Sequence, residues 1–182
     1  MVERIYLDNN ATTPVDPAVL GEMMPYFTEK FGNAASRNHA FGWEAEEAVE
    51  DARKIIAHEL NAKPREVVFT SGATESVNLA IKGLCEVSDD KRKHIVTQVT
   101  EHKAVLDTCK EMQKRGWEVT YLPVQEDGRV SMSAVADAVR GDTLLVAIMH
   151  ANNEIGVLQR IDDIGKLCRE RDVRFLVDAA QS

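Results

Sequence analysis

Two kinds of hydrophobic pattern alternate along most of the chain. From Glu66 onward, short runs of β-branched and aromatic residues are followed by stretches whose apolar residues recur with the period of a helix. The runs predict strands at 66–70, 94–97, 118–122, 143–149 and 174–177, and the stretches predict helices at 74–86, 103–115, 131–139 and 161–171. This alternation is typical of βαβ units. We therefore expect an α/β fold with a parallel-rich sheet and helices on both faces.

The pattern before residue 66 is different. Asp16 followed by Pro17 is typical of a helix start, and the apolar residues after them fall on one helical face. A polar loop punctuated by glycine, at residues 31–42, precedes a second amphipathic helix. We therefore expect an N-terminal arm and flanking helices over residues 1–65, and a partial α/β domain over residues 66–182.

Composition and charge narrow the class of protein. The chain has 182 residues, of which 44% are hydrophobic and 29% are charged, as in ordinary soluble domains. The net charge of -8, without a tract rich in lysine and arginine, argues against binding to nucleic acid or to an anionic membrane surface. No His/Cys cluster has the spacing of metal ligands, so no metal site is expected.

The hydropathy and the cysteines indicate a compartment. The longest apolar run, residues 144–149, is too short to span a bilayer, and the chain begins without the features of a signal peptide. The three cysteines are widely spaced and odd in number, which fits a reducing environment better than a disulfide framework. These features predict a soluble, cytoplasmic protein.

Polar residues follow four of the five predicted strands. In open parallel sheets, ligands bind beyond the carboxyl ends of the strands, so these residues are the candidates for a site. They are Ser71-Gly72-Ala73-Thr74 after the first strand, Glu101 and His102 after the second, residues 150–156 after the fourth, and Asp178 and Gln181 after the fifth.

The turn from Ser71 to Thr74 has two interpretations. A tight turn that leads into a helix directs backbone N–H groups and the positive helix end toward one point, which suits a phosphate, and the two hydroxyl groups would add hydrogen bonds. Simple capping of the helix by Ser71 explains the same residues without a ligand, and the motif alone favours this second interpretation.

The other candidates also have alternatives. Asp178 follows an apolar strand, where we expect a buried carboxylate, which needs either a cationic partner or a role as the cap of the next helix. His102 precedes a helix and either serves the structure or stacks on a flat ligand and transfers protons. Asn152 and Asn153 form either an ordinary turn or a donor to a phenolic oxygen.

Taken together and in order, these motifs resemble the cysteine desulfurase family of fold-type I pyridoxal-phosphate enzymes, and in particular its iron–sulfur-cluster assembly branch. The matching stretches are YLDNNATTP at 6–14, FGNAASRNHAFG at 31–42, FTSGATES at 69–76, TEHKAV at 100–105, HANNEIG at 150–156 and VDAAQS at 177–182. The resemblance covers the whole chain and implies part of an aminotransferase-like large domain that binds pyridoxal 5'-phosphate.

The resemblance also assigns roles to single residues. Ala73 and Thr74 would hold the cofactor phosphate, and the catalytic His102 would stack on the pyridine ring and assist proton transfer. Asn153 would bind near the phenolic oxygen of the cofactor.

Two more residues complete this set. Asp178 would pair with the protonated ring nitrogen, which keeps the ring an electron sink, and Gln181 would also approach the phenolic oxygen.

The implied reaction converts L-cysteine to L-alanine and delivers sulfur as an enzyme persulfide, for iron–sulfur clusters and other sulfur compounds. A homodimer and sulfur-acceptor or scaffold proteins are the implied partners. Family members continue past residue 182, into the lysine that binds the cofactor covalently and the cysteine that accepts sulfur, so this chain is expected to be an N-terminal half without activity of its own. Two alternatives remain open: a non-catalytic fragment or subunit that needs a complementing chain, and a related selenocysteine lyase or aminotransferase.

Overall fold

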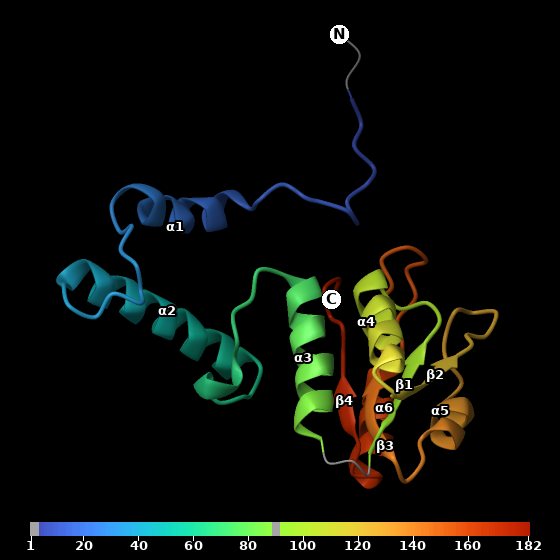
Figure 1. Ribbon diagram of the computed structural model, residues 1–182. Coiled ribbons are helices and arrows are strands. Elements are labelled where there is room, and N and C mark those ends of the chain that lie inside the picture. The colour runs from blue at the N-terminus through green and yellow to red at the C-terminus, as the bar shows by residue number, and fades with distance from the viewer. Residues whose placement is uncertain (1–3, 89–91) are drawn as a thin grey trace. The chain divides into compact units, whose positions relative to one another are not determined.

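The chain forms two compact units. The computed structural model describes residues 4–88 and 92–182, and its two units are Met1–Phe69 and Thr70–Ser182 (Figure 1). The division falls a few residues after the boundary expected at residue 65. The first three residues of the expected N-terminal arm lie outside the described residues.

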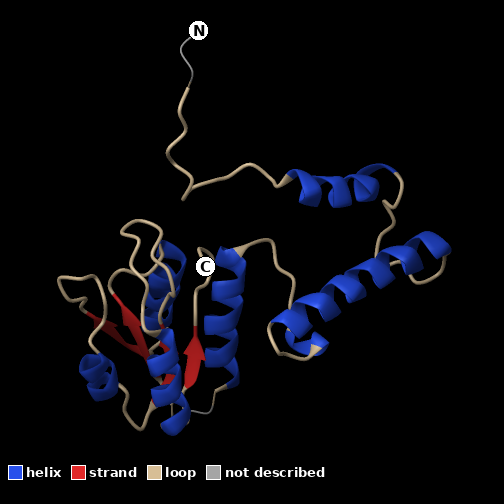
Figure 2. Cartoon of the chain, turned by 180° about the vertical axis from the view of Figure 1, so that it is seen from behind, coloured by secondary structure: helices blue, strands red, loops and turns tan. Residues whose placement is uncertain are grey.

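A sheet of four parallel strands forms the centre of the second unit (Figure 2). The strand order is β2-β1-β3-β4, which confirms the predicted parallel α/β class. The strands are β1 (His94–Gln98), β2 (Glu118–Leu122), β3 (Thr143–Ala147) and β4 (Arg174–Leu176). All five residues of β1 and all five of β3 are buried, because strands in the middle of a parallel sheet are covered on both faces.

Helices cover both faces of this sheet, as the sequence predicts. They are α3 (Ala73–Val87), α4 (Lys103–Lys114), α5 (Met132–Ala138) and α6 (Ile161–Glu170). Ile95 and Leu145 belong to the core cluster that α3 and α4 complete, whereas their neighbours Val96 and Val146 belong to the cluster that α5 and α6 complete. This alternation follows from the period of two in a strand, and each fully buried side chain contributes about 1.5–3 kcal/mol.

The first unit is helical and buries little of its surface. Its elements are α1 (Pro17–Thr28), α2 (Ala40–Glu59) and the short 3-10 helix η1 (Pro64–Glu66). As predicted, Asp16 caps α1 by accepting a hydrogen bond from the amide of Ala18 at 2.7 Å. No residue of α1 is buried, and α2 buries only Gly42, Ala45 and Ala57.

The loop between α1 and α2 depends on Gly42. A Cβ atom at this position would lie 1.8 Å from the backbone oxygen of Ser36, so only glycine permits the loop to approach the start of α2. The glycine punctuation of residues 31–42 therefore has a steric reason.

The strand predicted at residues 66–70 is not formed, and this prediction was wrong. Glu66 belongs to η1, and Val67 is extended but pairs with no strand among the described residues. Its carbonyl oxygen accepts a hydrogen bond from the Arg53 guanidinium instead. Val68 is 64% exposed and Phe69 49% exposed. A β-branched run has strand propensity, but a strand exists only where a neighbour satisfies its backbone groups.

Candidate active site

Three turns at the carboxyl edge of the sheet carry four of the six predicted site residues, and hydrogen bonds join these turns. The side-chain amide of Asn152, in the loop after β3, donates to the carbonyl oxygen of Thr100, after β1, at 2.8 Å. The backbone amide of His150 donates to the carbonyl oxygen of Asp178, after β4, at 2.9 Å. The structure thus brings together the motifs that the sequence places after β1, β3 and β4.

The start of α3 is shaped by Glu75 rather than by a serine cap. The Glu75 carboxylate accepts hydrogen bonds from the amide and the hydroxyl of Ser71, at 2.7 and 2.6 Å, and these bonds lower its pKa. The cap residue is Gly72, with φ 155 and ψ 177, and it makes no side-chain hydrogen bond. Ser71 therefore neither caps the helix nor offers a free hydroxyl proton. The first-turn amides of Ala73 and Thr74 remain, at the positive end of α3, where an anion binds well.

The geometry of His102 is compatible with both roles that the sequence left open, the structural role and contact with a ligand. Its Nδ1 accepts a hydrogen bond from the amide of Ala104 at 3.1 Å, so the ring caps α4. Because Nδ1 is an acceptor there, the proton of the neutral ring lies on Nε2. The side chain is exposed, and its ring remains accessible to a ligand.

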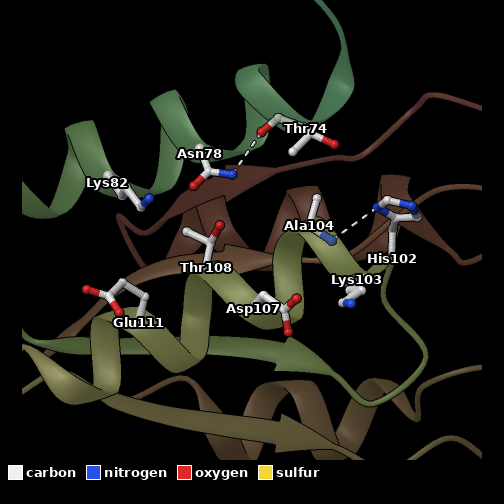
Figure 3. A pocket seen from close by; sticks show the side chains of 9 residues that line it. All are labelled: Thr74, Asn78, Lys82, His102, Lys103, Ala104, Asp107, Thr108 and Glu111. Carbon is white, nitrogen blue, oxygen red and sulfur yellow. Dashed lines mark hydrogen bonds between the residues drawn. The ribbon is translucent and has the colours of Figure 1, made fainter.

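A pocket of about 380 Å³ lies between α3 and α4 (Figure 3). Thr74 and His102 lie toward one end of this pocket, and Lys82 and Glu111 lie toward the other. Thr74, from the predicted phosphate turn, therefore shares a pocket with His102, which makes the start of α3 part of the same candidate site.

A second pocket of about 600 Å³ lies on the other side of the turn that carries His102. His102 and Asn153 both line it, together with Glu101 and Asn152. Asn153 is half-buried. His102 borders both pockets, so it connects the phosphate turn with the loop after β3.

Three predicted site residues do not line these two pockets: Ala73, Asp178 and Gln181. Asp178 is half-buried rather than buried as expected, and its Oδ1 accepts a hydrogen bond from the amide of Ala180 at 3.1 Å. The short turn after β4 leaves the carboxylate partly open to solvent. Gln181 is exposed.

Glu101 is a buried acid that the predicted set of site residues did not include. Burial raises the pKa of its carboxyl group to about 7, in spite of two hydrogen bonds that lower it. The signal in the sequence was its position in the short turn after a strand, directly before His102.

The cysteines do not resemble nucleophiles. Cys85, Cys109 and Cys168 are free and buried, and burial raises their pKa values to about 11, about 12 and about 11. Over residues 4–88 and 92–182, no group of three or more metal-binding side chains is placed to hold an ion. The same residues include no helix long and apolar enough to cross a membrane.

A parallel α/β sheet with a phosphate-type helix start and polar turns at its carboxyl edge is typical of ligand-binding α/β proteins. The aminotransferase class-V family matches the chain over residues 5–182, and the chain belongs to this family. The cysteine desulfurase IscS of Neisseria meningitidis serogroup C is 60% identical over 178 residues, which are 98% of this chain and 44% of that protein. The chain therefore spans less than half the length of the curated relatives it matches, and it corresponds to their N-terminal half.

Solved structures support the same family. A NifS-like protein has a TM-score of 0.94 and 41% identity, over 99% of this chain and 50% of that one. SspA in complex with cysteine has a TM-score of 0.91 and 44% identity, over 97% of this chain and 51% of that one.

The family uses pyridoxal phosphate, and the residues present fit this cofactor. The α3 start offers backbone amides and the Thr74 hydroxyl at a helix N-terminus, which suits the phosphate. The ring of His102 is exposed beside it, and the half-open carboxylate of Asp178 is suited to a cationic partner at the same edge of the sheet.

Proposed function

We propose that the chain is part of a pyridoxal-phosphate-dependent cysteine desulfurase, which converts L-cysteine to L-alanine and transfers the sulfur as a persulfide for iron–sulfur clusters and other sulfur compounds. The observation that carries this proposal is the 60% identity to a cysteine desulfurase across 98% of the chain. The solved relative that holds cysteine supports the substrate, because 97% of this chain aligns with it.

The chain's own residues have defined tasks in this proposal. Thr74 and the amides at the start of α3 bind the phosphate, and the capped ring of His102 stacks on the pyridine ring and moves protons through Nε2. When bound, pyridoxal phosphate supplies the electron sink that activates the bonds at the α-carbon of an amino acid.

The remaining residues orient the ring. Asp178 pairs with its protonated nitrogen, while Asn153 and Gln181 bind near its phenolic oxygen. The hydrogen bond from Ala180 holds the Asp178 carboxylate in one orientation, and Asn152 holds the loop that carries Asn153.

The partners in this proposal are those of a desulfurase: L-cysteine, a second copy in a homodimer, and sulfur-acceptor or scaffold proteins. The proposed location is the cytoplasm. Three free, buried thiols support this location, and the net charge of -8 argues against a nucleic-acid partner.

The test measures alanine release from L-cysteine and the absorbance of the bound cofactor in the full-length protein. Asp178→Ala should lower alanine release at least about tenfold, since it removes a charge-assisted bond and with it the electron sink. His102→Ala should shift the absorbance band. His58→Ala is the control, because the His58 side chain is 87% exposed in the other unit of the chain.

Circular dichroism establishes that each variant is folded. Alanine release by Asp178→Ala at the rate of the control would contradict the role of this residue. A wild-type protein that binds pyridoxal phosphate but releases no alanine would contradict the proposed reaction while retaining the cofactor.

A further inference from the structure

The buried carboxyl group of Glu101 joins the ends of two strands. Its Oε1 accepts a hydrogen bond from the amide of Met149, after β3, at 2.6 Å, and another from the side chain of Gln98, the last residue of β1, at 2.8 Å. Glu101 is 6% exposed and immediately precedes His102. One oxygen atom therefore fixes the turn that carries His102 to the end of β3.

A second connection runs in the opposite direction. Asn152 immediately precedes Asn153, and its amide nitrogen donates to the carbonyl oxygen of Thr100 at 2.8 Å. Its oxygen accepts from the amides of Glu154 and Ile155, at 2.8 and 3.0 Å. His102 thus follows the buried Glu101, which accepts a hydrogen bond from the chain after β3. Asn153 follows the buried Asn152, which donates a hydrogen bond to the turn after β1.

This cluster is not arranged for maximal stability. Several buried side-chain atoms in it have no hydrogen-bond partner in the part of the chain that the structure describes: Thr97 Oγ1, Gln98 Oε1, Thr100 Oγ1 and Glu101 Oε2. Burial of unpaired polar atoms costs stability. A carboxyl group that is buried despite this loss of stability, next to an exposed histidine, indicates a functional role at the site.

We propose that Glu101 is a positioning residue that fixes the β1–α4 turn against the end of β3 and so sets His102 opposite Asn153 across the pocket that both line. The assignment of a cofactor to that pocket rests on the proposed function. The hydrogen bonds themselves do not.

The reach of the side chain, rather than its charge, is what positions the turn. The titratable groups that interact with Glu101 are Asp178, after β4, and Cys109, on α4. Burial and the Asp178 carboxylate raise the pKa of Glu101 to about 7, so both protonation states occur near neutral pH. Oε1 accepts the same two hydrogen bonds in either state, because a proton on Oε2 leaves the carbonyl oxygen free.

Two conservative variants separate reach from charge. Glu101→Gln keeps the length and the acceptor oxygen but cannot ionise, whereas Glu101→Asp keeps the charge but withdraws the oxygen by one methylene group. We expect Glu101→Asp to accelerate hydrogen exchange at the Met149 amide about tenfold, to shift the NMR signals of His102 and Asn153, and to weaken binding of added pyridoxal phosphate about tenfold. Glu101→Gln should leave the NMR signals and the binding near those of wild type, and should change exchange at the Met149 amide by no more than about twofold relative to exchange at the buried core residue Ile95.

The matched controls are Glu170→Asp and Glu170→Gln, since Glu170 is exposed on α6. The proposal is overturned if Glu101→Asp matches its control, or if Glu101→Gln shows the defects expected of Glu101→Asp. Should Glu101→Asp fail to fold, the wild-type protein decides: across the titration of Glu101, protection of the Met149 amide must change no more than protection of the buried core residue Ile95, and a larger loss refutes the proposal. Exchange and NMR signals need no cofactor, so a wild-type protein that does not bind pyridoxal phosphate would contradict only the proposed function.

Discussion

His94 is fully buried and bridges three strands through its ring. Its Nδ1 lies 2.8 Å from the hydroxyl of Thr143 on β3, and its Nε2 lies 2.8 Å from the hydroxyl of Thr120 on β2. Burial, reinforced by Arg140, lowers the pKa of His94 below 6.5, although Asp142 and Glu118 act in the opposite direction. The folded protein therefore holds this ring in its neutral form.

This lowered pKa predicts a pH-dependent stability. Between the folded-state pKa and 6.5, the unfolded chain binds more protons at this residue than the folded chain does. The contribution of His94 to the free energy of unfolding should therefore rise with pH in that window and level off above it. Urea unfolding from about pH 5 to about pH 7.5 measures this. His94→Gln should lack this component, whereas His58→Gln should keep it, and equal pH profiles for the two variants would contradict the assignment.

Glu101 predicts the opposite dependence. Its pKa rises from 4.5 to about 7 on folding, so ionisation destabilises the folded state as pH increases through this range. The shift corresponds to about 3 kcal/mol. At pH values above about 7, Glu101→Gln should raise the free energy of unfolding by up to this amount, and near pH 4.5 it should change little. Urea titrations at both pH values, beside Glu170→Gln, measure the effect; equal shifts at both would contradict it.

Single residues show how far the sequence could be interpreted. The position of His102 at a helix start follows from local pattern, and the structure confirms that start. The pairing of Ser71 with Glu75 was missed, because a serine before a helix is equally compatible with capping by its own side chain. The half-exposed state of Asp178 was also missed, since burial depends on the turn after the strand rather than on the apolar residues before it.

The start of α3 depends on the backbone conformation of Gly72. Its φ of 155 is one that residues with side chains rarely adopt, although a Cβ atom there would meet nothing within 4 Å. Gly83, in the same helix, has the same open space and ordinary helical geometry. The two positions therefore have the same room for a Cβ atom but differ in backbone conformation.

Alanine at these two positions should have opposite effects. Gly72→Ala should destabilise the protein by about 1–3 kcal/mol through backbone strain, and should weaken binding of pyridoxal phosphate by distorting the first turn. Gly83→Ala should stabilise it by about 1 kcal/mol, because alanine is the better helix former. Urea unfolding and cofactor titration measure both. A Gly72→Ala protein as stable as Gly83→Ala would show that φ at residue 72 is not constrained.

Elements differ in how well the sequence predicts them. The four helices of the second unit begin within a residue of their predicted starts, because helical period and caps are local signals. The run at 66–70 contains as many β-branched residues as β1, but strand formation requires a neighbouring strand, and composition does not predict which segment that neighbour is. Long-range pairing is thus where prediction from this sequence failed.

The two units of the chain differ in how much apolar surface they bury. The second unit contains two clusters of buried side chains, one on each face of its sheet. In the first, Ile5 is 80% exposed, Leu7 is 85% exposed, and α1 buries nothing. Helices gain most of their stability from packing, so the first unit lacks the usual source.

Separate fragments should therefore behave differently. A fragment of residues 70–182 should unfold cooperatively in urea and retain helical circular dichroism. A fragment of residues 1–69 should show weak helicity and no cooperative transition, since helices gain most of their stability from packing and α1 and α2 bury few residues. A cooperative transition in the shorter fragment would show that packing within the first unit suffices.

β1 precedes its partners in the chain, yet it lies between β2 and β3 in the finished sheet. During synthesis on a ribosome, the partner of His94 on β3 follows 49 residues later. At bacterial and eukaryotic elongation rates this delay is roughly 2 to 10 s. Throughout that interval, Ile95 and Val96 lack the ladder that β3 provides. This apolar strand is prone to aggregation until β3 emerges. The speed of translation between β1 and β3 therefore sets the time for which a chaperone would have to protect the strand.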